Sequence, residues 1–396
     1  MSFVLSDKKL RHIENHIQKN YINSGKYPGV LIGFYNKGDV TLLDPLGMMD
    51  VERSRPMGKD SIFRIYSMTK PITSVALMQL YESGSINLND PVYKYIESWK
   101  NLKVYNSGDL GNFIVDTPVR HMTIKDLMTH QSGLSYGYIS NTKIDELYRE
   151  LSSPDGFFNN STEDLIESLS NLPLLFSPGT LWNYSVSTDV IGYIVSIVSG
   201  YSLEEYMNKN IFYPLGMPDT GFHVSSSKVH RFTANYYNSP SDKLKLVDDP
   251  ESSRYLKKPG FFSGGGGLVS TFDDYIKFSS MLLNKGVFQD KKVINASTVE
   301  LMTENHLFNN QDLLSTAMPG LRWAESSFEG IGFGLGFSIQ MENTDEGPAG
   351  QYGWGGAAST YFWIDPHSEF ICIFLTQLMP SYSYKIRNEL KKIVYS

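Results

Sequence analysis

Ser67 and Lys70, in the tetrapeptide Ser67-Met68-Thr69-Lys70, are of the right types and spacing for nucleophilic chemistry. Residues three apart share a helix face, so the lysine amine can lie beside the serine hydroxyl. Partial burial and a helix N-terminus both disfavour the ammonium form, which lowers the lysine pKa towards that of a usable base. The tetrapeptide therefore fits a serine nucleophile activated by a lysine.

The Ser-x-x-Lys pattern is a weak signal by itself, because it occurs four times, starting at Ser6, Ser67, Ser140 and Ser225. Only Ser67 opens a long apolar segment, from Ile72 to Tyr81, which stops at Gly84. That pattern is typical of a buried helix ended by a glycine. The alternative is an N-capping serine followed, one turn later, by a solvated lysine.

A second segment places Tyr184 between a Pro-Gly turn and an apolar helix over residues 190–195, which Ser187 or Thr188 would cap. A tyrosine in a helix-entry loop can point its phenol into a cleft. A neighbouring ammonium group would lower the pKa of that phenol. The alternative is an aromatic side chain that merely fills space between two lobes.

A third segment, Trp354-Gly355-Gly356-Ala357, precedes a predicted strand over Tyr361–Ile364. Small residues at a strand end let another backbone or a substrate approach closely. Their N–H groups can also point towards a developing oxyanion. The alternative is a plain β-bulge or hairpin.

The three segments, in this order, resemble the serine β-lactamase-like superfamily, in particular the branch that unites class C β-lactamases and family VIII carboxylesterases. Three further stretches are similar to this branch: residues 123–134, 211–220 and 264–271. The resemblance thus extends from about Phe63 to Ile364. It implies an α/β fold of the β-lactamase and penicillin-binding-protein type, with a mainly antiparallel sheet flanked by helices plus a helical lobe.

The resemblance also implies roles for individual residues. Ser67 would be the acylated nucleophile, Lys70 its partner, and Tyr184 the second member of the base pair. The backbone N–H groups of Ser67 and Ala357 would form the oxyanion hole. The reaction would be acyl transfer through an acyl-enzyme that water hydrolyses, without a metal or an organic cofactor. The expected substrate-binding residues are Tyr136, Val186, Trp354, Gly355 and Gly356.

Two departures from the lactamase pattern bear on the substrate. Val186 stands where lactamases have the Asn of Tyr-x-Asn, and Trp354-Gly355-Gly356 replaces Lys-Thr-Gly and resembles the Trp-x-Gly of family VIII esterases. Neither side chain supplies a cation or an amide, so the site should favour uncharged esters with apolar acyl groups. We predict a carboxylesterase for small short-acyl esters. The alternatives are a β-lactamase, a D-amino-acid amidase or peptidase, an acyltransferase, and a catalytically silent binding relative.

Other motifs suggest competing sites. Gly-x-Ser-x-Gly around Ser135 matches the nucleophile elbow of α/β-hydrolases, but a helix-like stretch over residues 124–130 precedes it where the elbow needs a strand. His12 and His16 lack the Glu of the His-Glu-x-x-His zinc motif. We expect His130 to anchor its loop through hydrogen bonds.

The elements that would position these residues follow from hydrophobic patterning. The region from about residue 70 to 260 reads as mostly helical. We therefore expect an α/β lobe from residues 1–75 and 260–396, a mainly helical lobe from residues 76–259, and the active site in the cleft between them. Predicted strands are Gly29–Tyr35, Phe333–Gln340, Ala358–Ile364 and Phe370–Leu375; predicted helices include Ser6–Asn23, Phe272–Leu283 and Tyr384–Val394.

Composition bounds the remaining possibilities. The 396 residues carry a net charge of −7 without a block of Lys or Arg, which offers no footprint for nucleic acid. Cys372 is the single cysteine, so no intrachain disulfide can form. Met1–Lys9 does not read as a signal peptide and no apolar stretch is long enough to span a bilayer. We expect a cytoplasmic protein with a small-molecule ester substrate; the sequence does not indicate the oligomeric state.

Overall fold

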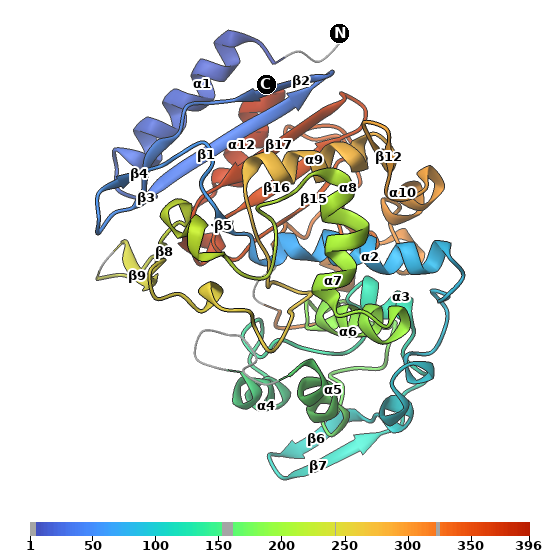
Figure 1. Cartoon of the computed structure of the whole chain (residues 1–396). Helices are drawn as coiled ribbons and strands as arrows, with labels where there is room; N and C mark the ends of the chain where they lie inside the picture. Colours follow the sequence, from blue (N-terminus) through green and yellow to red (C-terminus); the bar gives the residue numbers. More distant parts are fainter. Residues whose placement is uncertain (1–4, 153–160, 242, 322–324) are drawn as a thin grey trace.

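A nine-stranded antiparallel sheet is the base of the fold in the computed structural model, which describes residues 5–152, 161–241, 243–321 and 325–396 (Figure 1). Its strands run in the order β13-β14-β15-β16-β17-β1-β3-β4, with β2 paired to β1. The pairing of Leu31 with Leu375 joins strands from the two ends of the chain. The strands are β1 (Gly29–Asn36), β2 (Asp39–Leu42), β3 (Leu46–Asp50), β4 (Arg55–Pro56), β13 (Ile331–Phe333), β14 (Ser338–Gln340), β15 (Tyr352–Gly355), β16 (Tyr361–Asp365) and β17 (Phe370–Leu375).

The two faces of this sheet belong to two different cores, because successive strand residues point to opposite faces. Val30, Ile32 and Phe34 lie in a core with helices α1 (Asp7–Ile17) and α12 (Ile386–Tyr395), which also contact each other. Leu31 faces the larger core. On that side α9 (Phe272–Leu283) packs on β17 and β1 (Figure 1).

Helix α2 (Thr69–Glu82) is buried on nearly all sides, as its apolar sequence predicts, and it contacts α6 (Ser187–Ser199). A 3₁₀ turn, Tyr66–Met68, leads into it. The other helices are α3 (Ile124–Met128), α4 (Lys143–Leu151), α5 (Thr162–Ser170), α7 (Leu203–Met207), α8 (Tyr213–Leu215), α10 (Ala296–Met302) and α11 (Leu313–Thr316). The remaining strands are β5 (Phe63–Arg64), β6 (Val104–Asp109), β7 (Asn112–Asp116), β8 (Asn235–Tyr237), β9 (Lys245–Asp248), β10 (Val269–Ser270), β11 (Val287–Phe288), β12 (Lys291–Lys292) and β18 (Leu378–Met379).

The structure differs from the predicted elements in several places. The predicted strand Phe333–Gln340 is two strands joined by a turn, in which Gly336 adopts a φ of +102°. Neither Ser187 nor Thr188 caps α6, whose N-cap is Val186; the Ser187 hydroxyl is instead hydrogen-bonded to Ser132 and Ser185. The middle of the chain, predicted to be mostly helical, also contains the hairpin β6–β7 and the antiparallel pair β8–β9. The predicted strand Ala358–Ile364 begins only at Tyr361. The strand Phe370–Leu375 and the helix Phe272–Leu283 are confirmed.

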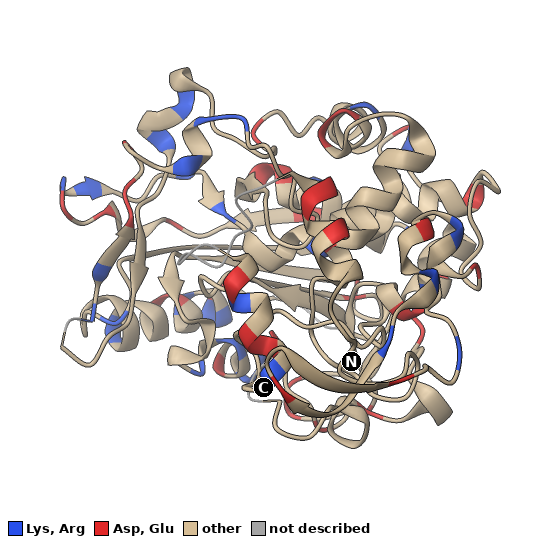
Figure 2. Ribbon diagram, turned by 90° about the horizontal axis from the view of Figure 1, so that it is seen from below, with Lys and Arg blue, Asp and Glu red and all other residues tan. Residues whose placement is uncertain are grey.

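Charged positions of both signs are interspersed over the helices and loops (Figure 2). Among the described residues, no helix combines the length and apolar character needed to cross a membrane. Residues 1–4, part of the segment considered above as a signal peptide, lie outside the described residues.

Candidate active site

Ser67 lies in the 3₁₀ turn at the start of α2, directly after a strained residue. Tyr66 has a φ of +42°, a left-handed conformation that is costly for a residue with a side chain. The side chain of Lys70 returns over this turn, and its amine donates a hydrogen bond to Ser67 Oγ at 3.2 Å. The i, i+3 spacing thus brings the two groups together, as expected from the sequence.

Lys70 is held by a second hydrogen bond, from Nζ to the carbonyl oxygen of Gly265 at 2.6 Å. The side chain is 2% exposed, and the loss of hydration lowers its pKa to about 7, although the carboxylates of Asp189 and Glu325 oppose the shift. A large fraction of the Lys70 side chains is therefore neutral near pH 7. A neutral amine beside a hydroxyl can accept its proton.

Tyr184 is fully buried in the loop before α6, and its phenol is hydrogen-bonded to Ser67. The indole Nε1 of Trp354 donates a hydrogen bond to the same phenol oxygen at 3.1 Å. The expectation that an ammonium group lowers the Tyr184 pKa is wrong. Burial raises the pKa well above its ordinary value and outweighs the two hydrogen bonds. Tyr184 is therefore a neutral phenol at pH 7, able to pass a proton on.

His130 supports the loop that carries Tyr184. Its ring lies 4.9 Å from the Tyr184 ring, its Nδ1 is hydrogen-bonded to Ser185 Oγ at 3.2 Å, and its backbone carbonyl accepts from Asn183. Burial, and then the charge of Lys70, lower its pKa well below the ordinary value. His130 is a neutral anchor, consistent with the sequence interpretation.

The turn that contains Ala357 packs against the backbone leading into Ser67. It connects β15 to β16 and is closed by a hydrogen bond from Gly356 N to the Thr360 carbonyl oxygen at 2.8 Å. A Cβ atom on Gly356 would collide with the carbonyl oxygen of Ile65, two residues before Ser67. Glycine is therefore required for this close approach, which brings the Ala357 turn beside the Ser67 turn.

Arg387 of α12 fixes the same turn from its other side. One guanidinium nitrogen, Nη2, donates to the carbonyl oxygens of Gly356 and Thr360 at 3.0 and 2.9 Å. The guanidinium forms an ion pair at 2.8 Å with Glu325, whose carboxylate is fully buried. Burial raises the pKa of Glu325, while Arg387 opposes the shift.

The structure therefore adds Gly265, Glu325 and Arg387 to the residues of the candidate site. Glu325 and Arg387 were missed because nothing in their local sequence distinguishes them. Gly265 lies in a run of four glycines within residues 264–271, a stretch that resembles the family. That run could have indicated a loop close to the site.

The predicted substrate-binding residues lie in different settings. Tyr136 faces the site, with its ring 5.2 Å from Lys70 Nζ and 5.3 Å from the Tyr184 ring. Trp354 contacts Tyr184, as described above. Val186 is buried in the larger core at the start of α6, and its N–H donates to the Ser135 carbonyl oxygen. Gly355 lies against the Arg387 guanidinium.

Ser135, the competing nucleophile, is fully buried, and its hydroxyl donates a hydrogen bond to the carboxylate of Asp145 in α4. That carboxylate also accepts from Ser140 and from the N-cap residue Thr142. Ser135 therefore belongs to a buried network that anchors the start of α4. Its contacts are those of a structural serine, in agreement with the prediction.

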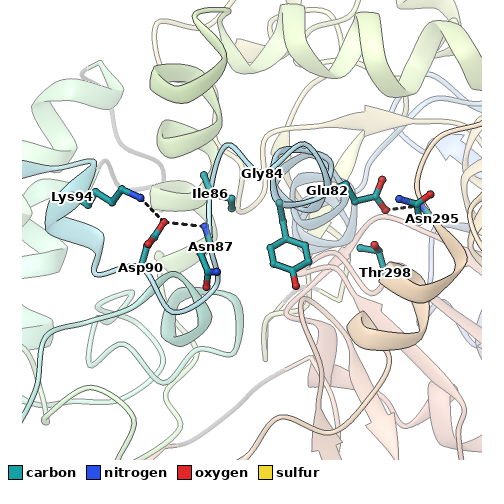
Figure 3. Close-up of a pocket in the computed structure, with 9 residues that line it drawn as sticks. Glu82, Gly84, Ile86, Asn87, Asp90, Lys94, Asn295 and Thr298 are labelled. Atoms are coloured by element: carbon teal, nitrogen blue, oxygen red, sulfur yellow. Dashed lines mark hydrogen bonds and ion pairs between the residues drawn. The ribbon is translucent and has the colours of Figure 1, made fainter.

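A surface pocket of about 450 Å³ lies at the far end of α2 from Lys70 (Figure 3). Its Asp90 carboxylate accepts from Lys94 Nζ and from the N–H of Asn87, both at 2.9 Å. Glu82 accepts from the N–H of Asn295 at 2.6 Å. These acidic groups are hydrogen-bonded within the protein, so the pocket is a weaker candidate for an active site than the surroundings of Ser67.

Comparison with known proteins agrees with this geometry. The model of the beta-lactamase family matches residues 11–395. Protein Rv1367c of Mycobacterium tuberculosis is 31% identical and covers 91% of this chain and 88% of its own length. A lovastatin esterase of Penicillium rubens is 30% identical and covers 87% of each chain. The solved structure of EstCE1, described as a hydrolase with promiscuous acyltransferase activity, is 22% identical and superposes with a TM-score of 0.80 over 99% of this chain and 100% of its own.

Proposed function

The chain belongs to the beta-lactamase family, and from that premise we propose that it is a serine carboxylesterase for small esters with short acyl groups. Its fold and its relatives are those of serine hydrolases and acyl-transferring enzymes. The observation that carries the proposal is the hydrogen bond from Lys70 Nζ to Ser67 Oγ at a buried position where the lysine pKa is about 7.

The reaction would begin when the neutral amine of Lys70 takes the proton of Ser67 and Oγ attacks the ester carbonyl carbon. The N–H groups of Ser67 and Ala357 would stabilise the resulting oxyanion. Collapse of the tetrahedral intermediate breaks the bond to the alkoxy group, which leaves as an alcohol after taking a proton from the Tyr184 phenol. The phenol regains a proton from Lys70. Water then attacks the acyl-Ser67 ester by the reverse route and releases the acid.

The surroundings support an uncharged substrate. Tyr136, Tyr184 and Trp354 form a cluster of rings around Lys70 and Ser67. A β-lactam would bring a carboxylate and an amide, for which Trp354 and Val186 supply neither a cation nor a side-chain amide. Each polar group left unpaired on burial costs about 1–3 kcal/mol, which is roughly ten- to a hundredfold in rate.

A comparison of two substrates tests the proposal. We expect kcat/KM for p-nitrophenyl acetate or butyrate to exceed that for a chromogenic cephalosporin by at least about a hundredfold, since two unpaired groups are involved. Across a series of p-nitrophenyl esters with increasing acyl length, kcat/KM should be highest for short acyl chains. Efficient cephalosporin hydrolysis would favour a β-lactamase. Failure of both substrates and of a serine-directed phosphonate probe would favour a silent relative.

Acyl transfer to an alcohol is the second candidate. EstCE1, whose fold this chain shares, is described as having that activity. The products formed from vinyl butyrate in the presence of butanol distinguish acyl transfer from hydrolysis. Butyl butyrate in excess over butyric acid at low alcohol concentration would indicate a transferase, and butyric acid as the main product would indicate an esterase.

A further inference from the structure

We propose that Asp189 is a positioning residue for Lys70: its buried carboxylate holds the glycine loop that receives the lysine amine and provides the negative charge that balances it. This inference rests on the proposed function, because it takes Lys70 as the base. Asp189 has no role in the catalytic steps proposed above.

The contacts form a short chain from Asp189 to Lys70. Asp189 is the third residue of α6 and is 2% exposed. Its Oδ1 accepts hydrogen bonds from Ser263 Oγ at 2.6 Å and from Gly265 N at 3.0 Å. The carbonyl oxygen of Gly265 accepts from Lys70 Nζ at 2.6 Å. A single loop residue is therefore bonded to the carboxylate through its N–H and to the lysine through its C=O.

The glycines make this arrangement possible. A Cβ atom on Gly265 would collide with Asp189 Oδ2 and with the Tyr136 hydroxyl. A Cβ atom on Gly264 would collide with the carbonyl oxygen of Thr188, next to Asp189. The loop thus lies directly on the first turn of α6. Contact with the carboxylate therefore requires glycine at position 265, and contact with the α6 backbone requires it at position 264.

The charge of Asp189 also acts on Lys70. The groups that face the lysine are the carboxylates of Asp189 and Glu325, the phenols of Tyr136 and Tyr184, and the imidazole of His130. Desolvation lowers the Lys70 pKa, and Asp189 is the stronger of the two carboxylates that oppose this shift. Without Asp189 the lysine would lose its proton at still lower pH, while its carbonyl partner would lose its anchor.

The test is the pH profile of kcat/KM for p-nitrophenyl butyrate in Asp189→Asn, Asp189→Glu and a matched control, Asp274→Asn. Asp274 is also the third residue of its helix, α9, and is also buried. It accepts from one hydroxyl, Thr220 Oγ1 at 2.9 Å, and one backbone N–H, that of Asp219 at 2.7 Å. The control therefore repeats the loss of a buried carboxylate away from Lys70.

We expect the acid limb of the profile to move to lower pH by about one unit in Asp189→Asn, because removal of one nearby buried charge changes a pKa by on the order of one unit. Asp189→Glu should restore the limb to within a few tenths of a unit, and Asp274→Asn should leave it in place. A limb that stays in place in active Asp189→Asn, or that moves equally in Asp274→Asn, would overturn the inference.

Two further measurements keep the result interpretable. Titration of the Lys70 ¹³Cε signal in ¹³C-lysine-labelled protein, assigned with Lys70→Met, measures the lysine pKa without turnover. If the wild type has no esterase activity, the proposed function is refuted, but the effect of Asp189 on Lys70 can still be tested. If Asp189→Asn does not fold, Ser263→Ala removes one of the two bonds between loop and carboxylate. We then expect kcat to fall several-fold at unchanged KM, and an unchanged kcat would refute the positioning role.

Discussion

At the scale of single residues, the candidate site depends on burial. Lys70 and Tyr184 are both removed from water, and in each case desolvation favours the neutral form. For lysine this lowers the pKa and creates a base at neutral pH. For tyrosine it raises the pKa and preserves a proton donor. Near pH 7 the phenol is therefore neutral and the amine is neutral in a large fraction of the molecules, and both groups are hydrogen-bonded to Ser67.

Removal of the Ser67 hydroxyl should abolish ester turnover and labelling by a phosphonate probe. Ser67→Ala deletes one atom, so circular dichroism and the melting temperature should remain close to those of the wild type. Ser135→Ala is the control: it should keep turnover within a few-fold, while the buried Asp145 carboxylate loses a donor and stability falls by about 1–3 kcal/mol. An active Ser67→Ala together with an inactive Ser135→Ala would reverse the assignment.

Lys70 and Tyr184 should behave as one catalytic unit. In a kinetic double-mutant cycle, Lys70→Ala, Tyr184→Phe and the double variant should lose similar amounts of kcat, on the order of a thousandfold or more, because loss of either group stops the same proton transfer. The measurement is kcat on a p-nitrophenyl ester at pH 8 with active sites counted. Losses that multiply would show that the two residues act independently.

At the scale of elements, the site is a meeting of short turns that glycines allow to come close. The turn before α2, the glycine loop and the β15–β16 turn each contact a neighbour through backbone atoms. Side chains from more distant elements then fix these turns. Asp189 of α6 holds the glycine loop, and Arg387 of α12 holds the β15–β16 turn.

Arg387→Met should reduce kcat by roughly 10- to 100-fold with little change in KM, because the turn with the Ala357 N–H loses its support while substrate contacts remain. The variant also leaves Glu325 buried without its partner, which costs about 3–5 kcal/mol of stability. The double variant Arg387→Met/Glu325→Gln should recover much of that stability, but not kcat. Recovery of both in the double variant would mean that the arginine serves only the buried carboxylate.

Trp354 in β15 should separate the two substrate classes. Trp354→Lys introduces a cation, so it should narrow the ratio of ester to cephalosporin kcat/KM about tenfold, partly by loss of the hydrogen bond to Tyr184. Val186 remains, so the gap should not close. Trp354→Phe keeps a ring and loses the N–H; it should lower ester turnover without a gain on cephalosporin. An equal change in the ratio for both variants would exclude the charge explanation.

At the scale of the whole molecule, the sheet separates two hydrophobic cores, and α2 carries the candidate base into the larger one. The buried charged or polar residues Lys70, Asp189 and Glu325 lie in this region. Transfer of such groups from water opposes folding. We therefore expect the candidate site to reduce the stability of the molecule that contains it.

Lys70→Met should raise the free energy of unfolding by about 2–4 kcal/mol at pH 6. The lysine pKa is about 7 in the folded protein and 10.5 when exposed. Between these values the unfolded chain binds more protons, so the stability of the wild type rises with pH, and below about pH 7 the full penalty is present. The penalty approaches about 5 kcal/mol, from which the loss of the bond to Gly265 subtracts about 1–3.

Urea denaturation at pH 6 and pH 10 measures this effect. The gain in Lys70→Met should be large at pH 6 and absent at pH 10. Lys209, an exposed lysine of the π-helical turn after α7, is the control, and Lys209→Met should change stability little at either pH. A gain that is the same at both pH values would show that packing, and not the buried charge, is responsible.

The sequence by itself determined the parts of the site that are local. The spacing of Ser67 and Lys70 on one helix, the burial of that helix and the glycines before β16 can all be read from neighbouring residues. The strand Phe370–Leu375 and the helix Phe272–Leu283 follow from runs of apolar residues and are confirmed. Local patterns are sufficient here because helix and strand periodicities act over a few residues.

Only the tertiary structure decided which distant groups surround the candidate site and how they shift the pKa values of Lys70 and Tyr184. Arg387 is 31 residues from Gly356 and Gly265 is 195 residues from Lys70, so no local pattern relates them. The same holds for the pKa of Tyr184, for which the sequence predicted the wrong direction. A pKa depends on the balance between desolvation and nearby charges, and that balance exists only when segments from the whole chain have packed around the phenol.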